Sequence, residues 1–81
     1  MKNTLLTMRQ RKALLLFAFK FSYQQIGDML GASAHTIKND ILKAYKLLGT
    51  NCLSMAVLLC LINAEFTVAD IKCIYYSLPK P

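Results

Sequence analysis

SYQQIGDMLGASAHTIKN, residues 22–39, contains the starts of two helices and the turn between them. Ser22 is a typical N-cap for a helix over Tyr23–Leu30, and Gly31 is placed to end that helix in a left-handed conformation. Ser33 can cap a second helix two residues after that glycine. Two short helices joined in this way have the outline of a helix-turn-helix, a pattern of low specificity on its own.

The segment before this stretch predicts a helix from about Met8 to Lys20. Thr7 and Gln10 have the spacing of a capping box, and apolar residues follow them at helical intervals. The helix after Ser33 has Gly49 as its stop and carries an apolar stripe of Ile37, Ile41, Ala44, Tyr45 and Leu48.

The second half of the chain predicts two further helices. An apolar run from about Cys52 to Ala64 is the fourth, and a box-like start at Thr67 opens a fifth, which Pro79 ends. Ile74–Tyr76 is also compatible with a strand, but no other segment can pair with it, so we favour a helix. The expected architecture is all-α, with residues 1–81 in a single domain.

Composition excludes several classes of protein. At 81 residues and 9.1 kDa the chain is too short for a nucleotide-binding sheet or a barrel. Hydrophobic residues make up 56% of it and charged residues 17%, which excludes disorder of the whole chain. The net charge of +6 lies entirely in residues 1–48. This basic half suits nucleic acid or an anionic membrane surface, and solvated lysines are the ordinary alternative.

Cysteine usage and the N-terminus indicate a cytoplasmic protein. Cys52, Cys60 and Cys73 do not form a disulfide framework, and with the single His35 they make no convincing zinc site. We expect all three to be small apolar core residues. No signal peptide is recognisable, and the longest apolar run, Cys52–Ile62, is about half of a ~20-residue membrane span. We therefore expect neither a metal site nor a membrane partner.

The helix after Ser33 has a second face that the core does not use, and this face is polar and cationic. Asparagine can pair with adenine in the major groove of DNA, and lysine can reach guanine or a phosphate. An ordinary solvated face is the alternative. The residues on this face are His35, Thr36, Lys38, Asn39, Lys43 and Lys46.

Short sequence matches to a known family run through residues 6–64: Leu6-Thr7-x-Arg9-x-Arg11, Leu14, Ser22, Ile26, Leu30, Ser33, Thr36-Ile37-Lys38-Asn39, Leu48-Gly49 and Ala56-Val57. Their combined order resembles the LuxR/GerE-type DNA-binding domain. The resemblance implies an all-α, four-helix LuxR/GerE-like helix-turn-helix domain, with residues 65–81 as an added C-terminal helix. It also implies a transcriptional regulator without catalysis or cofactor. Such a regulator binds double-stranded DNA as a homodimer, with the third helix (about residues 34–48) in the major groove.

The resemblance also assigns roles to individual residues. The positions that contact phosphates, bases or the groove are occupied here by Thr36, Lys38, Asn39, Lys43 and Lys46, and those where the second helix touches phosphate by Ser22 and Gln24. Two departures from the family pattern matter. Asp40 replaces the usual histidine, which puts a negative charge beside DNA. Lys20 replaces a common glycine, so we expect the corner before the second helix to close differently.

Part of the same stretch also resembles the fourth region of bacterial sigma factors. Leu48-Gly49 and Ala56-Val57 favour the LuxR/GerE type, because sigma domains lack this dimerising fourth helix. A function of a different class is a protein-interaction module that sequesters another, larger regulatory protein, a hypothesis motivated by Asp40 and by surplus apolar surface. An enzyme is not expected, because the only histidine lies on the recognition helix and no carboxylate pair has usable spacing.

The fourth helix has more apolar positions than one face can bury. The core can use one set of them: Leu53, Val57, Cys60, Leu61 and Ala64. This leaves Met55, Leu59 and Ile62 at i, i+4 and i+7, a second stripe that we predict to be the homodimer interface. The C-terminal extension has its own stripe, expected to pack on the fourth or first helix: Val68, Ile71, Ile74, Tyr75 and Leu78.

Overall fold

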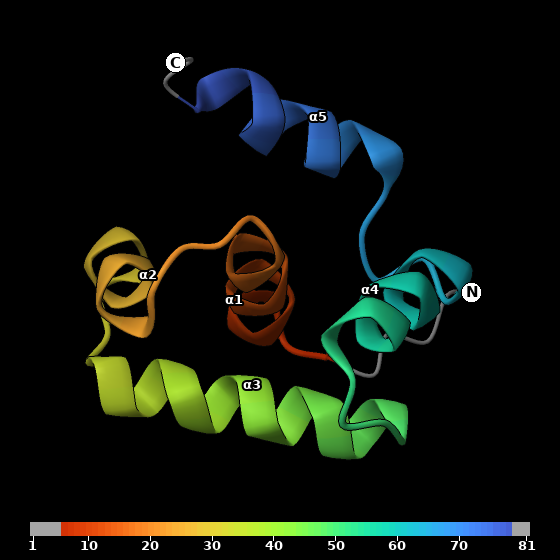
Figure 1. Ribbon diagram of the computed structural model, residues 1–81, viewed down its shortest axis with the longest axis horizontal. Helices are drawn as coiled ribbons and strands as arrows, with labels where there is room; N and C mark the ends of the chain where they lie inside the picture. The colour runs from red at the N-terminus through yellow and green to blue at the C-terminus, as the bar shows by residue number, and fades with distance from the viewer. Residues whose placement is uncertain (1–5, 79–81) are drawn as a thin grey trace.

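The computed structural model describes residues 6–78 and folds them into five α-helices (Figure 1). In chain order they are α1 (Met8–Ala18), α2 (Tyr23–Leu30), α3 (Ala34–Leu48), α4 (Leu53–Ile62) and α5 (Val68–Ser77). No strand occurs within the described residues, which confirms the all-α prediction. Pro79, the predicted end of the last helix, lies outside the described residues.

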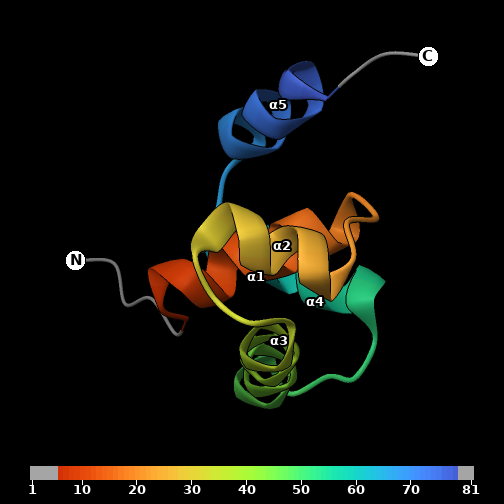
Figure 2. The same cartoon turned by 90° about the vertical axis from the view of Figure 1, so that its left-hand side faces the viewer.

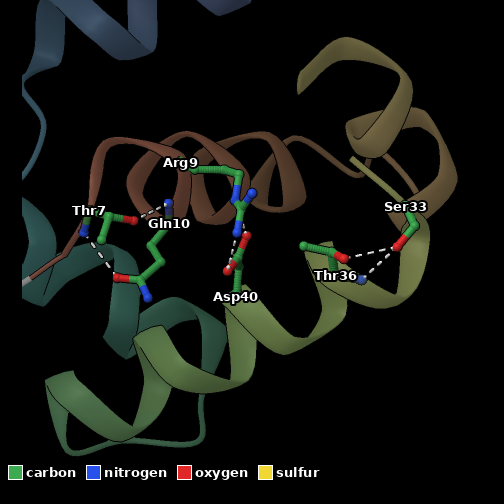
Figure 3. Close-up of polar contacts among 6 residues, drawn as sticks. All are labelled: Thr7, Arg9, Gln10, Ser33, Thr36 and Asp40. Atoms are coloured by element: carbon green, nitrogen blue, oxygen red, sulfur yellow. Dashed lines mark hydrogen bonds and ion pairs between the residues drawn. The ribbon is translucent and has the colours of Figure 1, made fainter. Parts of the chain in front are cut away.

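Four of the five helices begin with a side-chain cap at the residue that the sequence predicts. Thr7 Oγ1 accepts a hydrogen bond from the Gln10 backbone N–H at 3.1 Å, and Gln10 Oε1 accepts one from the Thr7 N–H at 2.9 Å (Figure 3). The same reciprocal box opens α2 at Ser22 and α5 at Thr67. These caps satisfy backbone donors that have no partner in the first turn, so the helix starts are determined locally.

The helices α1 to α4 are each followed by a residue with a positive φ angle: Lys20, Gly31, Gly49 and Ala64. We expected the corner before α2 to close differently because Lys20 stands where the resembled family has glycine, and this expectation is wrong. Lys20 itself adopts the left-handed conformation, with φ of 75°. The Phe21 N–H then donates to the Leu16 carbonyl at 3.3 Å, which closes the end of α1 as a glycine would.

The hydrophobic core is formed by the first four helices. α1 and α3 pack against each other, and each also contacts α2 and α4. The largest fully buried side chains are Leu14, Ile26, Ile37, Ile41 and Cys60. These residues therefore form the core and also hold α2 and α3 in their helix-turn-helix arrangement.

α5 lies beyond α1, on the side of α1 that faces away from α3 (Figures 1 and 2). Phe66, only 4% exposed, is buried just before it, whereas no residue of α5 itself is buried. Ile71 and Ile74 pack against the core while half-buried, but Val68 and Tyr75 are 59% and 52% exposed. The added C-terminal helix therefore forms as expected, but only part of its apolar stripe packs on the other helices.

Of the three cysteines only Cys60 is buried. The prediction that all three belong to the core is therefore wrong for Cys52 and Cys73, which are exposed. Cys52 precedes the first turn of α4, and Cys73 lies on the weakly packed α5. Within residues 6–78, no group of three or more His, Cys, Asp or Glu side chains could hold a metal ion.

No single helix within residues 6–78 is long and apolar enough to cross a membrane. α3 and α4 reach that length and composition only as a pair, and the chain bends by 63° between them.

Candidate nucleic-acid interface

α3 presents a polar, cationic face to solvent. Its other face carries Ile37, Ile41 and Ala44, which are buried against α1 and α2 and so fix which side of the helix points outward. The outward side chains recur at intervals of three and four residues and therefore share one face. They are His35, Lys38, Asn39, Lys43 and Lys46, all exposed. The structure thus brings most of the predicted DNA contacts onto one surface.

Asn39 and Leu42 are neighbours on this outward face. Asn39 Nδ2 lies 3.2 Å from His35 Nε2, one helical turn earlier. Together with Lys43 and Lys46, Asn39 and Leu42 line a shallow hollow of about 160 Å³. Leu42 is not among the predicted DNA contacts, although its position three residues after Asn39 places it on the same face. An apolar side chain there can contact a thymine methyl group.

Thr36 is placed differently from the other predicted contacts on α3. It is half-buried in the first turn, where its backbone N–H donates to Ser33 Oγ at 3.1 Å. The two hydroxyl groups are also hydrogen-bonded to each other at 2.9 Å (Figure 3). Thr36 therefore secures the start of α3, and its hydroxyl is oriented by Ser33.

Asp40 does not face outward, and the expectation that it puts a negative charge beside DNA is wrong. Its side chain is 7% exposed and points toward α1 (Figure 3). Arg9 Nε donates to Asp40 Oδ2 at 2.6 Å, and Arg9 Nη2 donates to Oδ1 at 3.3 Å. This two-point contact neutralises the carboxylate and ties α3 to α1. The outward face of α3 therefore carries no carboxylate.

A second buried carboxylate also forms an ion pair with an arginine of α1, but at a longer distance. Glu65, in the turn after α4, lies with its Oε1 at 3.7 Å from Arg11 Nη1. Arg9 and Arg11 thus both take part in internal ion pairs, although the sequence counts them in the basic half of the chain. The lysines of α3 remain as outward-facing positive charge.

The predicted phosphate contacts on α2 are exposed at its first turn. Ser22 Oγ accepts from the Gln25 N–H at 3.1 Å, and Gln25 Oε1 accepts from the Ser22 N–H at 2.9 Å. Gln24 Nε2 donates to Asp28 Oδ1 at 3.5 Å, so an acidic side chain lies beside this position. The Ser22 hydroxyl is therefore used as a cap. The N–H groups of the first turn and the Gln24 amide are the groups that can meet a phosphate.

Gly27 shapes the turn between α2 and α3, and sequence reasoning missed it. This glycine is buried, and a Cβ atom added to it would lie 2.4 Å from the Ala32 carbonyl oxygen. The chain passes directly over Gly27 as it enters the turn, so a larger residue would push α3 away from α2. A glycine inside an otherwise helical pattern is the signal that could have found it.

The stripe predicted as a dimer interface lies on the outward side of α4. Met55 and Ile62 are 48% and 76% exposed, and Leu59 is half-buried. Leu58, which the prediction did not include, is also exposed and lies on the same side of the helix. The opposite side of α4 contributes Ala56 and Cys60 to the core.

Two comparisons with known proteins bear on this site. Residues 5–48 match the family model described as sigma-70, region 4. A solved structure of the transcription factor GerE is similar to this chain with a TM-score of 0.70 and 32% sequence identity. The similarity covers 78% of this chain and 94% of the GerE chain. A search of curated protein sequences gives no match.

Proposed function

Because the chain belongs to the helix-turn-helix family of sigma-70 region 4 and GerE, we propose that it is a transcriptional regulator that binds double-stranded DNA sequence-specifically. α3 enters the major groove, and the protein acts in the cytoplasm. The observation that carries this proposal is the outward face of α3. It combines three lysines with an asparagine, while the one acidic residue of that helix is turned inward against Arg9.

The proposed contacts divide into those that read bases and those that bind phosphate. Asn39 can accept from and donate to an adenine edge, and Lys38 can donate to guanine. Lys43 and Lys46 lie further along the same face and meet the phosphate backbone. At α2, the N–H groups of the first turn bind a phosphate, because a helix N-terminus attracts anions.

The test is equilibrium binding of the full chain to DNA selected from a random pool, followed over a range of salt concentrations. Lys38→Ala and Asn39→Ala should each weaken binding to the selected site by about 1–3 kcal/mol and relax its sequence preference. Lys43→Ala should weaken binding to all sequences alike and reduce the salt slope by about one. Lys72→Ala, which removes the same charge from α5, is the matched control and should change neither quantity.

Failure to bind duplex DNA at low salt would overturn the proposal. In that case the alternative function, docking to another regulatory protein, would be favoured.

We further propose that the regulator is a homodimer joined through the outward side of α4. Met55, Leu58, Leu59 and Ile62 support this, since they form an apolar strip that the described residues of one chain leave largely open. Exposed apolar strips of this kind mark interaction surfaces. Two copies related by a two-fold axis would place their α3 helices in successive major grooves, about one DNA turn apart.

Sedimentation equilibrium and DNA binding test the dimer together. Ile62→Lys should give a folded monomer whose DNA affinity is reduced, because one recognition helix is then lost from the complex. Tyr76→Lys adds the same charge at an exposed aromatic residue of α5 and serves as the control. A wild-type chain that stays monomeric at tens of micromolar, on its own and on a palindromic site, would contradict the dimer.

A further inference from the structure

α5 lies on the opposite side of α1 from α3 (Figures 1 and 2), and side chains of α1, of α5 and of the turn before α5 line a cavity. Its volume is about 590 Å³. The apolar part of its lining comes from both helices and from the turn before α5, and includes Met8, Leu15, Leu16, Phe66, Cys73 and Ile74. This size and lining are typical of small-molecule sites, which measure about 300–1,000 Å³.

The charged residues around the cavity differ in whether another group neutralises or stabilises their charge. Arg11 is paired with the buried Glu65 at 3.7 Å. Asp70 accepts a hydrogen bond from the Thr67 N–H at 2.8 Å and lies at the N-terminus of α5, where the helix dipole favours a negative charge. Lys12 is exposed at the rim, and no carboxylate of residues 6–78 lies within 4.0 Å of its ammonium group. The cavity therefore combines apolar walls with one cation that has no acidic partner among the described residues.

We propose that this cavity binds a small anionic amphiphile of the medium-chain carboxylate class. The apolar chain lies between α1 and α5, and the carboxylate lies at Lys12. Charge complementarity selects this ligand, since an apolar chain alone would leave Lys12 unused and a cationic head would be repelled by it. The inference goes beyond the DNA-binding function and does not rest on it, because α3 is on the far side of α1.

α5 is suited to be the movable wall of such a site. None of its residues is buried, whereas Phe66 anchors the turn before it. Ile71 and Ile74 are half-buried, so closure over an apolar chain would remove more of their surface from water. A ligand that binds only the folded chain also raises its melting temperature.

The three cysteines provide a direct readout on the full-length protein. Cys73 lines the cavity, Cys52 is exposed outside it, and Cys60 is buried in the core. The experiment measures the alkylation rate of each cysteine by iodoacetamide, with mass spectrometry, as decanoate is added below its micellar concentration. We expect about tenfold slower alkylation of Cys73 at ten times the dissociation constant. The rate at Cys52 should not change, and Cys60 should stay unreactive, which shows that the chain has not unfolded.

Two controls test the role of the head group. Decyltrimethylammonium, with the same chain and the opposite charge, should protect Cys73 less than decanoate does. Lys12→Gln should weaken decanoate binding by about three- to fivefold, as expected for one partly exposed ion pair, while decanol binding stays the same. Lys72→Gln is the matched surface control and should leave the binding of decanoate and of decanol unchanged.

Three results would overturn the proposal. The first is no protection of Cys73 by decanoate, and the second is equal protection by the cationic amphiphile. The third is protection that rises with protein concentration in the absence of decanoate, which would assign the cavity to contact between two copies of the chain. None of these results depends on DNA binding, so failure here is distinguishable from failure of the regulator function.

Discussion

At the scale of single residues, Asp40 shows how a position on a recognition helix can serve the core instead. It lies three residues after Ile37 and four before Ala44, so it belongs to the inward stripe of α3. A carboxylate is tolerated there only if a cation compensates it, and Arg9 supplies that cation at 2.6 Å. Arg9 is half-exposed, which lowers the cost of bringing the pair together.

We predict that Asp40→Ala lowers the free energy of unfolding by about 1–3 kcal/mol, because the hydrogen-bonded ion pair to α1 is lost. Arg9→Ala should also destabilise, and the double variant should cost less than the sum of the two, with a coupling of about 0.5–3 kcal/mol. Urea unfolding measures all three. Asp28→Ala, at an exposed position of α2, should stay within about 0.5 kcal/mol of the wild type. A gain in DNA affinity by Asp40→Ala without loss of stability would show that the carboxylate faces the phosphates after all.

Because of Cys60, the stability of the fold depends on pH in the alkaline range. Burial, and secondarily the negative charge of Glu65, raises the pKa of its thiol from 9.0 to about 11. The folded chain then retains this proton between pH 9 and 11 while the unfolded chain loses it. The contribution of the protonated Cys60 thiol to the free energy of unfolding is therefore complete below pH 9 and falls as the pH rises through that window.

We accordingly expect the free energy of unfolding to fall from pH 8.5 to pH 10.5, a trend that Cys60→Ala should make less steep. Urea unfolding in the presence of a reductant provides the measurement. An equal slope for Cys60→Ala and the wild type would assign the pH dependence to other groups.

At the scale of whole elements, the helix ends differ in how well the residue after each helix suits the left-handed backbone conformation that it adopts. Gly31 and Gly49 occupy left-handed positions without strain, whereas Lys20 and Ala64 hold φ angles of 75° and 57° in spite of their Cβ atoms. A left-handed residue with a Cβ costs about 1–2 kcal/mol. The tertiary packing on both sides of these two corners must offset that cost.

Lys20→Gly and Ala64→Gly should therefore each stabilise the fold by up to about 1 kcal/mol, after the greater freedom of glycine in the unfolded chain is subtracted. This corresponds to a rise of roughly 4–8 °C in Tm for a domain of this size, measurable by circular dichroism. Gly49→Ala is the reverse change and should lower Tm by a similar amount. A lower Tm for both glycine variants would mean that the left-handed conformation carries no strain.

At the scale of the whole molecule, stability and recognition are located in different places. The core is shared by α1 to α4, and the outward lysines are on α3. α5 contributes only half-buried apolar contacts and lies on the other side of α1 (Figure 2). Removal of α5 should therefore leave the helix-turn-helix folded.

We predict that deletion of residues 67–81 lowers the free energy of unfolding by less than about 3 kcal/mol, since Ile71 and Ile74 lose only partial burial. Phe66→Ala in the full chain should cost more, about 3–5 kcal/mol, because it empties a buried site. Thermal and urea unfolding of both variants compare the two directly. If the deletion costs more than Phe66→Ala, α5 is a core element in solution.

Local chemistry in the sequence was enough to determine the helix starts and the recognition face. Thr7, Ser22, Ser33 and Thr67 cap the helices that they were expected to cap, because a cap needs only a side chain and a backbone N–H three residues later. The inward stripe of α3 follows from the helical period alone. Lys38, Asn39, Lys43 and Lys46 therefore had to face outward together.

Only the tertiary structure decided what lies opposite each residue. Arg9 and Asp40 are 31 residues apart, and nothing local indicates that they meet. The same holds for Arg11 with Glu65, and for the exposure of Cys52 and Cys73 where burial was expected. The helical periodicity of the sequence predicts which face of a helix a side chain lies on. Burial and ion pairing depend on which other helix packs against that face. The crossing of α1 over α3 turned a charge expected at the DNA surface into an internal ion pair, and left α5 with a cavity beneath it.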